Sequence, residues 1–419
     1  MPIESPPLSL ERLNATRNSL RDAVVHTAQW HNDALSATLN TSLAFKYENL
    51  QRAGSFKIRG ATNKIARLLA TGAQGNGVIA ASAGNHAQGV ARAAGLAGLR
   101  AVVVMPVNAP LTKVEACRKM GAEVHLHGTN LEQATELAQE VARRDNLAFL
   151  SPYDDWDVIA GQASCGLEMF EDDPDVTLAV VPLGGGGLLS GVALALKLQN
   201  PAIRVVGVQT DTVAPWRRFL ADGSIEEVAP DAHTIADGIK VKRAGELTRQ
   251  VIARYVDDIV TVSDNAIAEA IVTLLEHTHT IGEGAGVIGL AALMSGRIPV
   301  SERDRVVCVI SGGNVDTSLV GRSIDYGLAS SGRLINLSVT IQDTPGNLAH
   351  LLDTVARLSV NIRHVEHRRG ELHVPVGMTQ VILEMEARGP EHQEQLVTLF
   401  QEEGLQVNTL TTRQPKGQA

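Results

Sequence analysis

Short apolar runs alternate with longer amphipathic stretches between about residues 75 and 320. Several of the runs are apolar on both faces, as a parallel sheet covered by helices on both sides requires. The stretches between them repeat apolar residues at the 3.6-residue period of packed helices. This alternation predicts an α/β body with crossover helices. The predicted strands are 77–82, 101–105, 123–127, 177–182, 203–209 and 305–310, and the predicted helices include 87–95, 131–144, 188–198 and 266–277.

A different pattern begins at residue 333. Apolar and polar residues alternate over 335–341, as in a strand with one buried face, and an amphipathic helix follows Pro345 and Gly346. The remaining predicted elements are strands at 361–367 and 379–387, a helix from Pro390 that Gly404 ends, and a strand at 405–410. The order β-α-β-β-α-β predicts a ferredoxin-like domain over 333–413. Four small residues before it, Ala329 to Gly332, predict a short flexible linker.

Composition narrows the classes of partner and compartment. The chain has 37 Lys and Arg against 46 Asp and Glu, a net charge of −9, so we expect neither a nucleic acid nor an anionic membrane as partner. No apolar run approaches the roughly 18 residues of a membrane span, and the N-terminus lacks the pattern of a secretory signal. Three widely spaced cysteines, Cys117, Cys165 and Cys308, favour reduced thiols in a cytoplasmic protein over disulfides or a zinc site.

A lysine between two apolar residues is the first candidate for chemistry. Lys57 lies in the segment Gly54 to Ala61, flanked by Phe56 and Ile58. Apolar neighbours lower the pKa of a lysine and so make its neutral amine available to attack a carbonyl. The same residue, taken alone, is also compatible with a helix-start lysine that points to water.

Two further segments predict anion sites at the ends of strands. The small residues of Ser82 to Gly89 stand between a strand and an Ala-rich helix, where backbone N–H groups can hold a carboxylate or a phosphate. Four consecutive glycines, Gly184 to Gly187, stand before Leu188 and a predicted helix, and permit a phosphate to approach bare backbone. A dinucleotide fold is an alternative for these glycines, but it needs an acidic residue where the next strand has Gln209.

The set is completed by Ser311-Gly312-Gly313-Asn314, which follows a strand, and by Glu283 in a glycine-rich segment. Ligands bind at the carboxyl ends of strands in open α/β sheets, so Ser311 is a candidate contact. Each segment is also compatible with an ordinary turn.

The order of these motifs resembles that of the fold-type II pyridoxal-phosphate enzymes, in particular threonine ammonia-lyase and its serine dehydratase and serine racemase relatives. The resemblance covers roughly residues 15–320. The last 85 or so residues resemble a regulatory ACT domain, with Asp343 to Leu348 matching its strand-to-helix turn. The whole chain therefore resembles the medium-length threonine ammonia-lyases, which carry one ACT unit.

The resemblance implies a role for each motif. It implies a tryptophan-synthase-β-like catalytic region over 1–325, with a small lobe at about 47–155 inserted in a large lobe, 1–46 and 156–325. Lys57 would hold the cofactor and then remove the substrate Cα proton, and Ser82 could exchange a proton on the opposite face. The implied cofactor contacts are Phe56, Lys57, Asn85, Gly184, Gly185, Gly186, Gly187, Leu188, Glu283 and Ser311, and the implied carboxylate contacts are Ser82, Ala83, Gly84, Asn85 and His86.

The implied reaction is elimination from L-threonine to 2-oxobutanoate and ammonia, and from L-serine to pyruvate, in a homodimer or homotetramer feeding isoleucine biosynthesis. Dehydration of serine or 3-hydroxyaspartate and serine racemisation stay open on the same scaffold. A non-catalytic amino-acid-binding regulator is a further alternative, although it would have little reason to retain Lys57.

The C-terminal unit is expected to bind an isoleucine or valine effector, with a purely oligomerising domain as the alternative. The candidate effector residues are Asp343, Pro345, Gly346, Asn347 and Leu348. No metal is expected, because Gln209 stands where cation-binding relatives carry an acidic residue.

Overall fold

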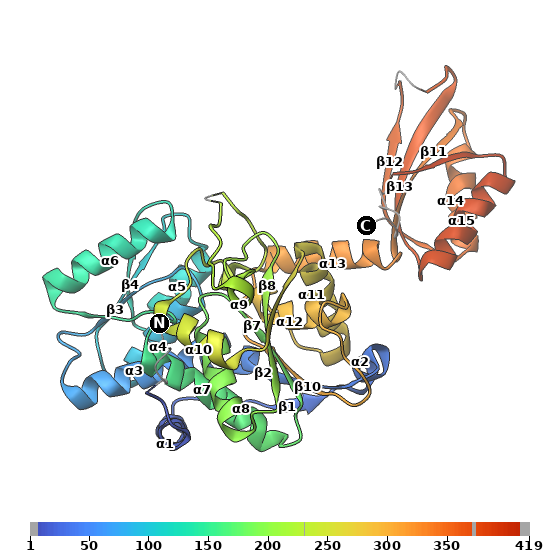
Figure 1. The fold of residues 1–419 in the computed structure, drawn as a ribbon. Helices are drawn as coiled ribbons and strands as arrows, with labels where there is room; N and C mark the ends of the chain where they lie inside the picture. The colour runs from blue at the N-terminus through green and yellow to red at the C-terminus, as the bar shows by residue number, and fades with distance from the viewer. Residues whose placement is uncertain (1–6, 230, 371–373, 411–419) are drawn as a thin grey trace. The chain divides into compact units, whose positions relative to one another are not determined.

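The computed structural model describes residues 7–229, 231–370 and 374–410, and the chain divides into two compact units, Met1–Leu319 and Val320–Ala419 (Figure 1). The first unit contains two β-sheets with helices around them, and the second contains one sheet with two helices on it. An α/β body followed by a ferredoxin-like unit is the predicted fold class, which the structure confirms.

The larger sheet of the first unit has six strands in the order β1-β2-β10-β7-β8-β9. All neighbours run parallel except β1 and β2, which pair antiparallel at one edge. Its strands are β1 (Gln29–His31), β2 (Ser42–Tyr47), β7 (Leu178–Pro182), β8 (Arg204–Thr210), β9 (Asp258–Val262) and β10 (Arg305–Ile310).

The smaller sheet has four parallel strands in the order β5-β4-β3-β6. Its central strands are buried along their whole length, as expected for a sheet covered on both faces. The strands are β3 (Val78–Ala81), β4 (Ala101–Met105), β5 (Glu123–Leu126) and β6 (Ala148–Phe149).

Helices connect these strands and cover both sheets (Figure 1). They are α1 (Leu10–Leu20), α2 (Asp33–Leu39), α3 (Lys57–Thr71), α4 (Asn85–Leu96), α5 (Leu111–Lys119), α6 (Leu131–Asp145), α7 (Trp156–Asp172), α8 (Gly187–Gln199), α9 (Phe219–Asp222), α10 (Glu246–Tyr255), α11 (Asp264–Thr278) and α12 (Gly284–Met294), with short 3-10 turns η1 (Glu48–Leu50), η2 (Arg52–Gly54) and η3 (Asp237–Ile239).

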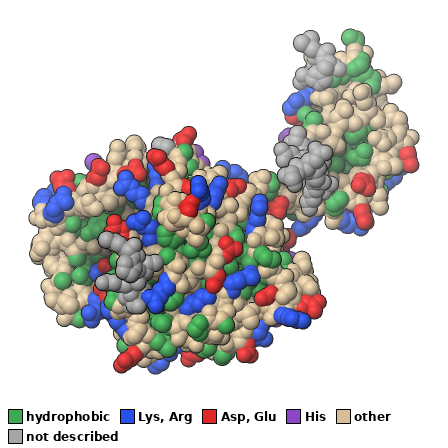
Figure 2. Space-filling view, viewed as in Figure 1, with side chains coloured by type: hydrophobic (Ala, Val, Ile, Leu, Met, Phe, Trp, Pro, Cys, Tyr) green, Lys and Arg blue, Asp and Glu red, His purple; other side chains and the backbone are tan. Residues whose placement is uncertain are grey.

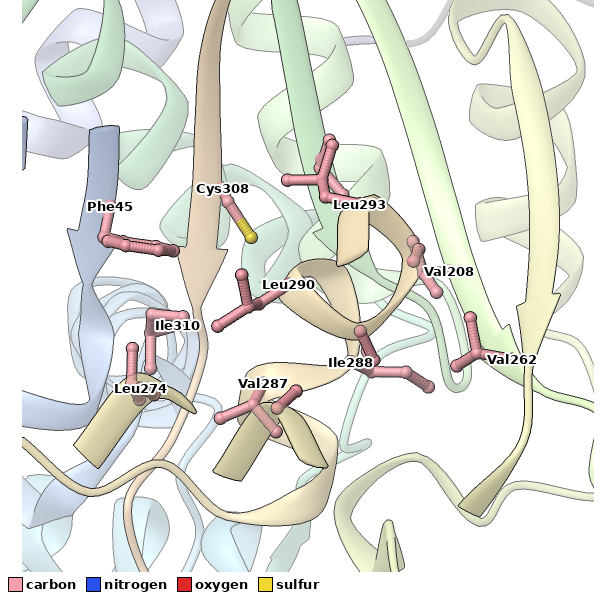
Figure 3. Packing of buried hydrophobic residues seen from close by; sticks show 14 of the residues in the cluster. Phe45, Val208, Val262, Leu274, Val287, Ile288, Leu290, Leu293, Cys308 and Ile310 are labelled. Atoms are coloured by element: carbon pink, nitrogen blue, oxygen red, sulfur yellow. The ribbon is translucent and has the colours of Figure 1, made fainter. Parts of the chain in front are cut away.

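Helix α12 shows how the interior of the first unit is filled. The helix is apolar on every side, and ten of its residues, from Gly284 to Leu293, are buried. Figure 3 shows Leu290 of α12 beside Cys308 of β10, with Phe45 of β2 beyond. A helix that is hydrophobic all round belongs in the core rather than on a surface. The start of α12 therefore holds Glu283 at the carboxyl end of β10, where Glu283 N donates to Gly312 O at 3.0 Å.

The second unit has the order β11-α14-β12-β13-α15-β14, with an antiparallel sheet arranged β12-β13-β11-β14. This is the predicted ferredoxin-like topology. Alternate residues of β13 are buried, which is the mark of a sheet with one face on a core. The elements are α13 (Thr317–Ser330), β11 (Leu334–Gln342), α14 (Asn347–Arg357), β12 (Asn361–Arg368), β13 (Met378–Glu386), α15 (Pro390–Glu402) and β14 (Gln406–Thr409).

The predicted flexible linker is wrong in its first half. Ala329 and Ser330 continue helix α13, and the two following residues close that helix through backbone hydrogen bonds from Ser331 to Gly327 and from Gly332 to Ala329. Small residues permit a turn but do not prevent a helix from running into it. The division between the two units falls inside α13, between Leu319 and Val320.

The distribution of surface charge and the free state of the cysteines agree with the expectations drawn from the composition. On the face in Figure 2, lysine and arginine lie among aspartate and glutamate without a broad patch of one sign. Among the described residues, no helix combines the length and the apolar character that a membrane crossing needs. All three cysteines are free and buried, and burial raises the pKa of the Cys117 thiol to about 11.

Candidate active site

The loop after β10 pairs directly with the segment that precedes Lys57. Ser55 and Gly312 form an antiparallel bridge, Phe56 N donates to Ser311 O at 3.1 Å, and Gly313 N donates to Gly54 O at 2.9 Å. Two motifs from opposite ends of the first unit are therefore joined by backbone hydrogen bonds. The arrangement places the Ser311 loop against the segment that leads into Lys57.

Lys57 begins helix α3 as a partly buried residue, and its Nζ donates to the carbonyl of Pro152 at 2.9 Å. Removal of the amine from water lowers the pKa of Lys57 to about 8, although the carboxylate of Glu283 opposes the shift. The Phe56 ring lies with its centroid 5.1 Å from Nζ. A desolvated amine with a pKa near neutrality is suited to form a covalent bond with an aldehyde.

The N-terminus of α4 presents backbone donors beside Lys57. Gly84 is the N-cap residue and has no side chain to cap the helix, so the first N–H groups, beginning at Asn85, have no partner within it. Ser82 follows β3, and its Oγ accepts from Gly84 N at 3.1 Å. Together with Ala83 this turn leaves backbone N–H groups at a helix start, where the sequence predicts an anion site.

His86 lies in the first turn of α4 and is a neutral residue near pH 7. Burial and the nearby charge of Lys57 lower its pKa to about 3. Its Nε2 lies 3.0 Å from the carbonyl of Leu150. A histidine that stays neutral can offer an anion its backbone N–H but not a charged ring.

Asn85 connects the cradle to Glu283. The side-chain Nδ2 of Asn85 donates to Oε1 of Glu283, which lies just before α12. Burial raises the pKa of Glu283, and the hydrogen bond from Asn85 opposes that shift. A Cβ at Gly312 would lie 2.5 Å from this Glu283 oxygen, so the close approach requires glycine there.

The four glycines form the turn between β7 and α8. Gly186 has φ +96°, a conformation that favours glycine, and is the N-cap of α8. The carbonyls of Gly184 and Gly185 accept from Trp216 Nε1 at 2.8 Å and from Thr248 Oγ1 at 2.9 Å. With the carbonyls held by protein donors, the N–H groups at the start of α8, up to the buried Leu188, are suited to an anion.

The glycine turn is also sterically closed to side chains. A Cβ at Gly185 would lie 2.3 Å from the Tyr153 ring, and one at Gly187 would lie 2.9 Å from the Tyr153 Cβ. Tyr153 donates to the Arg243 carbonyl at 3.1 Å, which keeps its ring against the turn. A cradle of bare backbone between a helix start and an aromatic ring fits a phosphate group.

Tyr153, Trp216 and Thr248 are site residues that sequence reasoning missed. They lie outside the recognisable motifs, on segments that reach the glycine turn only after folding. Only Tyr153 had a signal in the sequence, because Ser151-Pro152-Tyr153 places a proline and an aromatic residue just after the apolar run that ends at Leu150.

Gln209, which stands where no metal ligand is expected from the sequence, has a backbone partner. It is fully buried, and its Oε1 accepts from Trp216 N at 3.1 Å. Across the part of the chain that the structure describes, no group of three or more His, Cys, Asp or Glu residues is arranged to hold a metal ion.

The predicted effector residues lie in the second unit, around a pocket of about 290 Å³. Asp343, Pro345, Gly346 and Leu348 line it. Asn347 instead donates through its side chain to Gln342 O and Thr344 Oγ1 within the turn. The remaining lining residues are Ile341, Gln342, Thr344, His367, Arg369 and Thr379.

The fold and the site together define an enzyme that holds a phosphorylated aldehyde cofactor through a lysine. The chain belongs to the family described as "Pyridoxal-phosphate dependent enzyme", whose match spans residues 20–312. The residues present fit that cofactor, since they supply a desolvated amine for its aldehyde, a glycine cradle for its phosphate and a hydroxyl, Ser311, on the loop that pairs with the segment before Lys57.

Comparison with known proteins places the chain among threonine-directed members of this family. It is 42% identical to the L-threonine ammonia-lyase of Thermotoga maritima over 96% of this chain and 99% of that protein. It is 40% identical to the catabolic L-threonine dehydratase TdcB of Escherichia coli K12 over 75% of this chain and 96% of that protein. The solved structure of processed threonine deaminase isoform 2 from Solanum lycopersicum has a TM-score of 0.71 and 31% identity, covering 76% of this chain and 88% of that one. These similarities confirm the resemblance that the motifs indicate.

Proposed function

We propose that the protein is an L-threonine ammonia-lyase, which converts L-threonine to 2-oxobutanoate and ammonia and L-serine to pyruvate and ammonia. The observation that carries the proposal is the desolvated amine of Lys57 beside an N–H cradle and a glycine turn. The similarity to the Thermotoga maritima enzyme, which spans nearly the whole of both chains, supports threonine as the substrate.

Pyridoxal phosphate, when bound, supplies an aldehyde that captures the substrate amine and an aromatic ring that withdraws electrons from Cα. The neutral Lys57 amine would hold that aldehyde between turnovers and, as a free amine, would take the Cα proton of the substrate. The glycine turn holds the phosphate, while the first N–H groups of α4 hold the substrate carboxylate.

The side chains around the ring determine the fate of the substrate once its Cα proton has been removed. Asn85 would hold the phenolic oxygen, and Phe56 would support the ring. Ser311 would offer the pyridine nitrogen a hydroxyl, which does not force that nitrogen to stay protonated. The tempered electron withdrawal favours loss of the β-hydroxyl as water. Hydrolysis of the resulting unsaturated amine consumes one water, so the net products of threonine are 2-oxobutanoate and ammonia.

Racemisation of serine is the second candidate on this scaffold. It requires a proton donor on the face of Cα opposite Lys57, and Ser82 carries a hydroxyl at the end of β3. The Ser82 Oγ already accepts from Gly84 N, so its own hydrogen is available for donation. The hydroxyl thus retains the capacity that racemisation needs.

We further propose that the second unit is an ACT domain that binds a branched-chain amino acid, isoleucine or valine. Its pocket lies at the Asp343 to Leu348 turn, and Arg369 Nε donates to both carboxylate oxygens of Asp343, at 3.0 and 2.9 Å. A pocket with one carboxylate and one guanidinium suits a ligand that carries both an ammonium and a carboxylate.

The remaining assignments are part of the same proposal. The four-stranded parallel sheet of the first unit, β5-β4-β3-β6, supports a small lobe at about 47–155 inserted in a large lobe. We propose a homodimer or homotetramer, and a role in isoleucine biosynthesis. The three buried free thiols support a cytoplasmic location.

One assay tests the proposed reaction. Purified protein with added pyridoxal phosphate is incubated separately with L-threonine, L-serine and 3-hydroxyaspartate, and the release of 2-oxoacid and of ammonia is measured. We expect the two products in equal amounts. We expect the highest kcat/KM with threonine. Chiral analysis of the recovered serine reports racemisation. Release of no 2-oxoacid from any of the three would refute the proposal and favour a non-catalytic binding protein.

A further inference from the structure

A chain of side-chain amides runs from the turn before Lys57 to Glu283. Asn314 Nδ2 donates to the carbonyl of Ala53 at 2.9 Å and to Oδ1 of Asn85 at 2.8 Å. Asn85 in turn donates through its Nδ2 to Glu283. Asn314 is the last residue of the Ser311 motif, and none of the roles derived above uses it.

The side-chain amides of Asn314 and Asn85 can be oriented in only one way that satisfies these hydrogen bonds. A backbone carbonyl only accepts hydrogen bonds, so the Ala53 carbonyl requires the NH₂ group of Asn314 to face it. The second hydrogen of that NH₂ group then requires an acceptor, which is Oδ1 of Asn85. The NH₂ group of Asn85 is therefore directed the other way, toward Glu283. Asn314 thus determines which end of the Asn85 amide enters the site.

Packing holds Asn314 in place. Gly54 has φ +70°, and a Cβ there would lie 2.4 Å from Oδ1 of Asn314. The preceding Ala53 has φ 64° and ψ 15°, a left-handed conformation that costs energy for any residue with a Cβ. The Asn314 amide is lodged against this turn and cannot rotate without losing its bond to Ala53.

We propose that Asn314 is a positioning residue, which sets the amide of Asn85 so that an N–H, rather than the carbonyl oxygen, faces the cofactor. The NH₂ group of Asn85 has two hydrogens, of which Glu283 takes one, and the second is free for the phenolic oxygen. The inference rests on the proposed place of the cofactor beside Asn85. Asn314 itself contacts Ala53 and Asn85 and acts through them.

Two substitutions of similar size distinguish the loss of the Asn314 donors from their replacement by an acceptor. Asn314→Leu removes both donors. Asn314→Asp puts an acceptor in their place, so that the NH₂ group of Asn85 is drawn both toward the new carboxylate and toward Glu283, and no single orientation of the amide satisfies both. We expect pyridoxal phosphate to bind about tenfold more weakly to the Leu variant, the typical effect of one hydrogen bond to a charged group. The Asp variant should bind it more weakly still.

The measurements are the dissociation constant of pyridoxal phosphate and the visible absorption band of the bound cofactor. We expect the band to shift in both variants, since the N–H at the phenolic oxygen sets the protonation state of the chromophore. An effect on folding alone would leave the band of the bound fraction where it is. Unchanged affinity and an unchanged band in the Leu variant overturn the proposal. If the cofactor-free Asp variant does not fold, the Leu variant decides by itself.

Ala53→Gly provides the matched control. If Asn314 served only to hold Ala53 in its left-handed conformation, glycine at position 53 would restore cofactor binding to Asn314→Asp. We expect no restoration in the double variant, and full restoration would overturn the proposal. Wild-type protein treated with pyridoxal phosphate and borohydride gives an independent reading. Absence of a covalent adduct there would refute the proposed function, whereas normal adduct formation with unaffected Asn314 variants would refute only the role of Asn314.

Discussion

Arg59 and Glu168 are joined by two parallel hydrogen bonds of 2.7 Å in the interior of the first unit. Arg59 also donates to both oxygens of Glu48, and Lys46 Nζ lies 2.9 Å from Glu168. Arg59 stands two residues after Lys57 in α3, while Glu168 lies on α7. The ion pairs therefore fasten the first turn of α3 to α7 and to the end of β2.

This network predicts acid lability. Burial by itself raises the pKa of Glu168, but Arg59 and Lys46 outweigh it and hold the pKa below the usual value. A carboxyl group with a lowered pKa in the folded state stabilises the fold above its unfolded pKa, about 4.3, and loses that contribution as pH falls through the folded value. Glu168→Gln should cost on the order of 3 kcal/mol at pH 7 and flatten the fall of Tm below about pH 4.3.

Melting curves between pH 3 and 7 check this prediction. Glu123→Gln is the matched control, because its partner Arg100 is solvent-exposed and such a pair contributes little. Equal losses in the two variants at pH 7 would contradict the interior role of the network.

The amine of Lys57 should react with acylating reagents near neutrality. Its lowered pKa, about 8, means that half of the amine is neutral at that pH, whereas exposed lysines reach this point above pH 10. In cofactor-free protein the rate of Lys57 modification, followed by peptide mass spectrometry, should rise up to about pH 8 and then level off. Lys57→Ala should lower turnover at least about a thousandfold and abolish the borohydride-fixed adduct. A persisting adduct in that variant would assign the cofactor to another lysine.

Gly185→Ala should weaken cofactor binding. The added methyl group would lie 2.3 Å from Tyr153, so the ring or the turn must move and the phosphate cradle must deform. We expect a dissociation constant for pyridoxal phosphate at least about tenfold higher, corresponding to roughly 1.4 kcal/mol. Gly321→Ala is the control, since nothing lies within 4 Å of its Cβ position and it sits in helix α13. Equal cofactor affinity in both variants would contradict the proposed cradle.

Ser311→Asp should leave the cofactor bound and slow elimination. A carboxylate at this position fixes a proton on the pyridine nitrogen, which changes how the ring spreads the charge left by the Cα proton. The Ser311 Oγ makes only a long contact, 3.4 Å, with the Ala285 carbonyl, so it has no strong partner to lose. Steady-state kinetics should show a reduced kcat at an unchanged cofactor dissociation constant. Full turnover would remove Ser311 from the electronic argument.

Isoleucine or valine should bind the full-length protein and change its rate. Asp343→Asn removes one of the two charges at the pocket and should weaken that binding at least about fivefold, the lower end of typical coupling energies. Glu366→Gln, which alters an exposed ion pair with Arg368 outside the pocket lining, should leave it unchanged. Calorimetry and kinetics with both amino acids decide the matter. If neither ligand binds or alters the rate, only an oligomerising role remains for the unit.

The sequence predicts elements and motif positions well because both depend on local pattern. The runs 101–105 and 305–310 coincide with strands β4 and β10, and the other predicted elements named above differ from the observed ones by one or two residues at an end. Lys57 and Glu283 can be recognised as candidate site residues from the residues that flank them in the sequence. Periodicity and glycine placement are properties of neighbours along the chain, so they can be interpreted without knowledge of the fold.

The sequence does not reveal which distant side chains meet. The sequence gives no sign that Arg59 is buried, because only the folded chain brings Glu48 and Glu168 to it. Ala53 gives no sign of its left-handed backbone, since the residue that holds it, Asn314, is 261 positions away. The linker prediction failed for a related reason: whether small residues extend a helix depends on the helix before them.

The bridge between Ser55 and Gly312 has a consequence for the folding of the nascent chain during its synthesis. The strand pairing that completes the site joins the first sixth of the chain to residues near position 312, so a nascent chain can build the four-stranded sheet long before it can close the site. Contacts of such long sequence separation form late and slowly. Cofactor capture should therefore be one of the last events of synthesis, after Asn314 has left the exit tunnel.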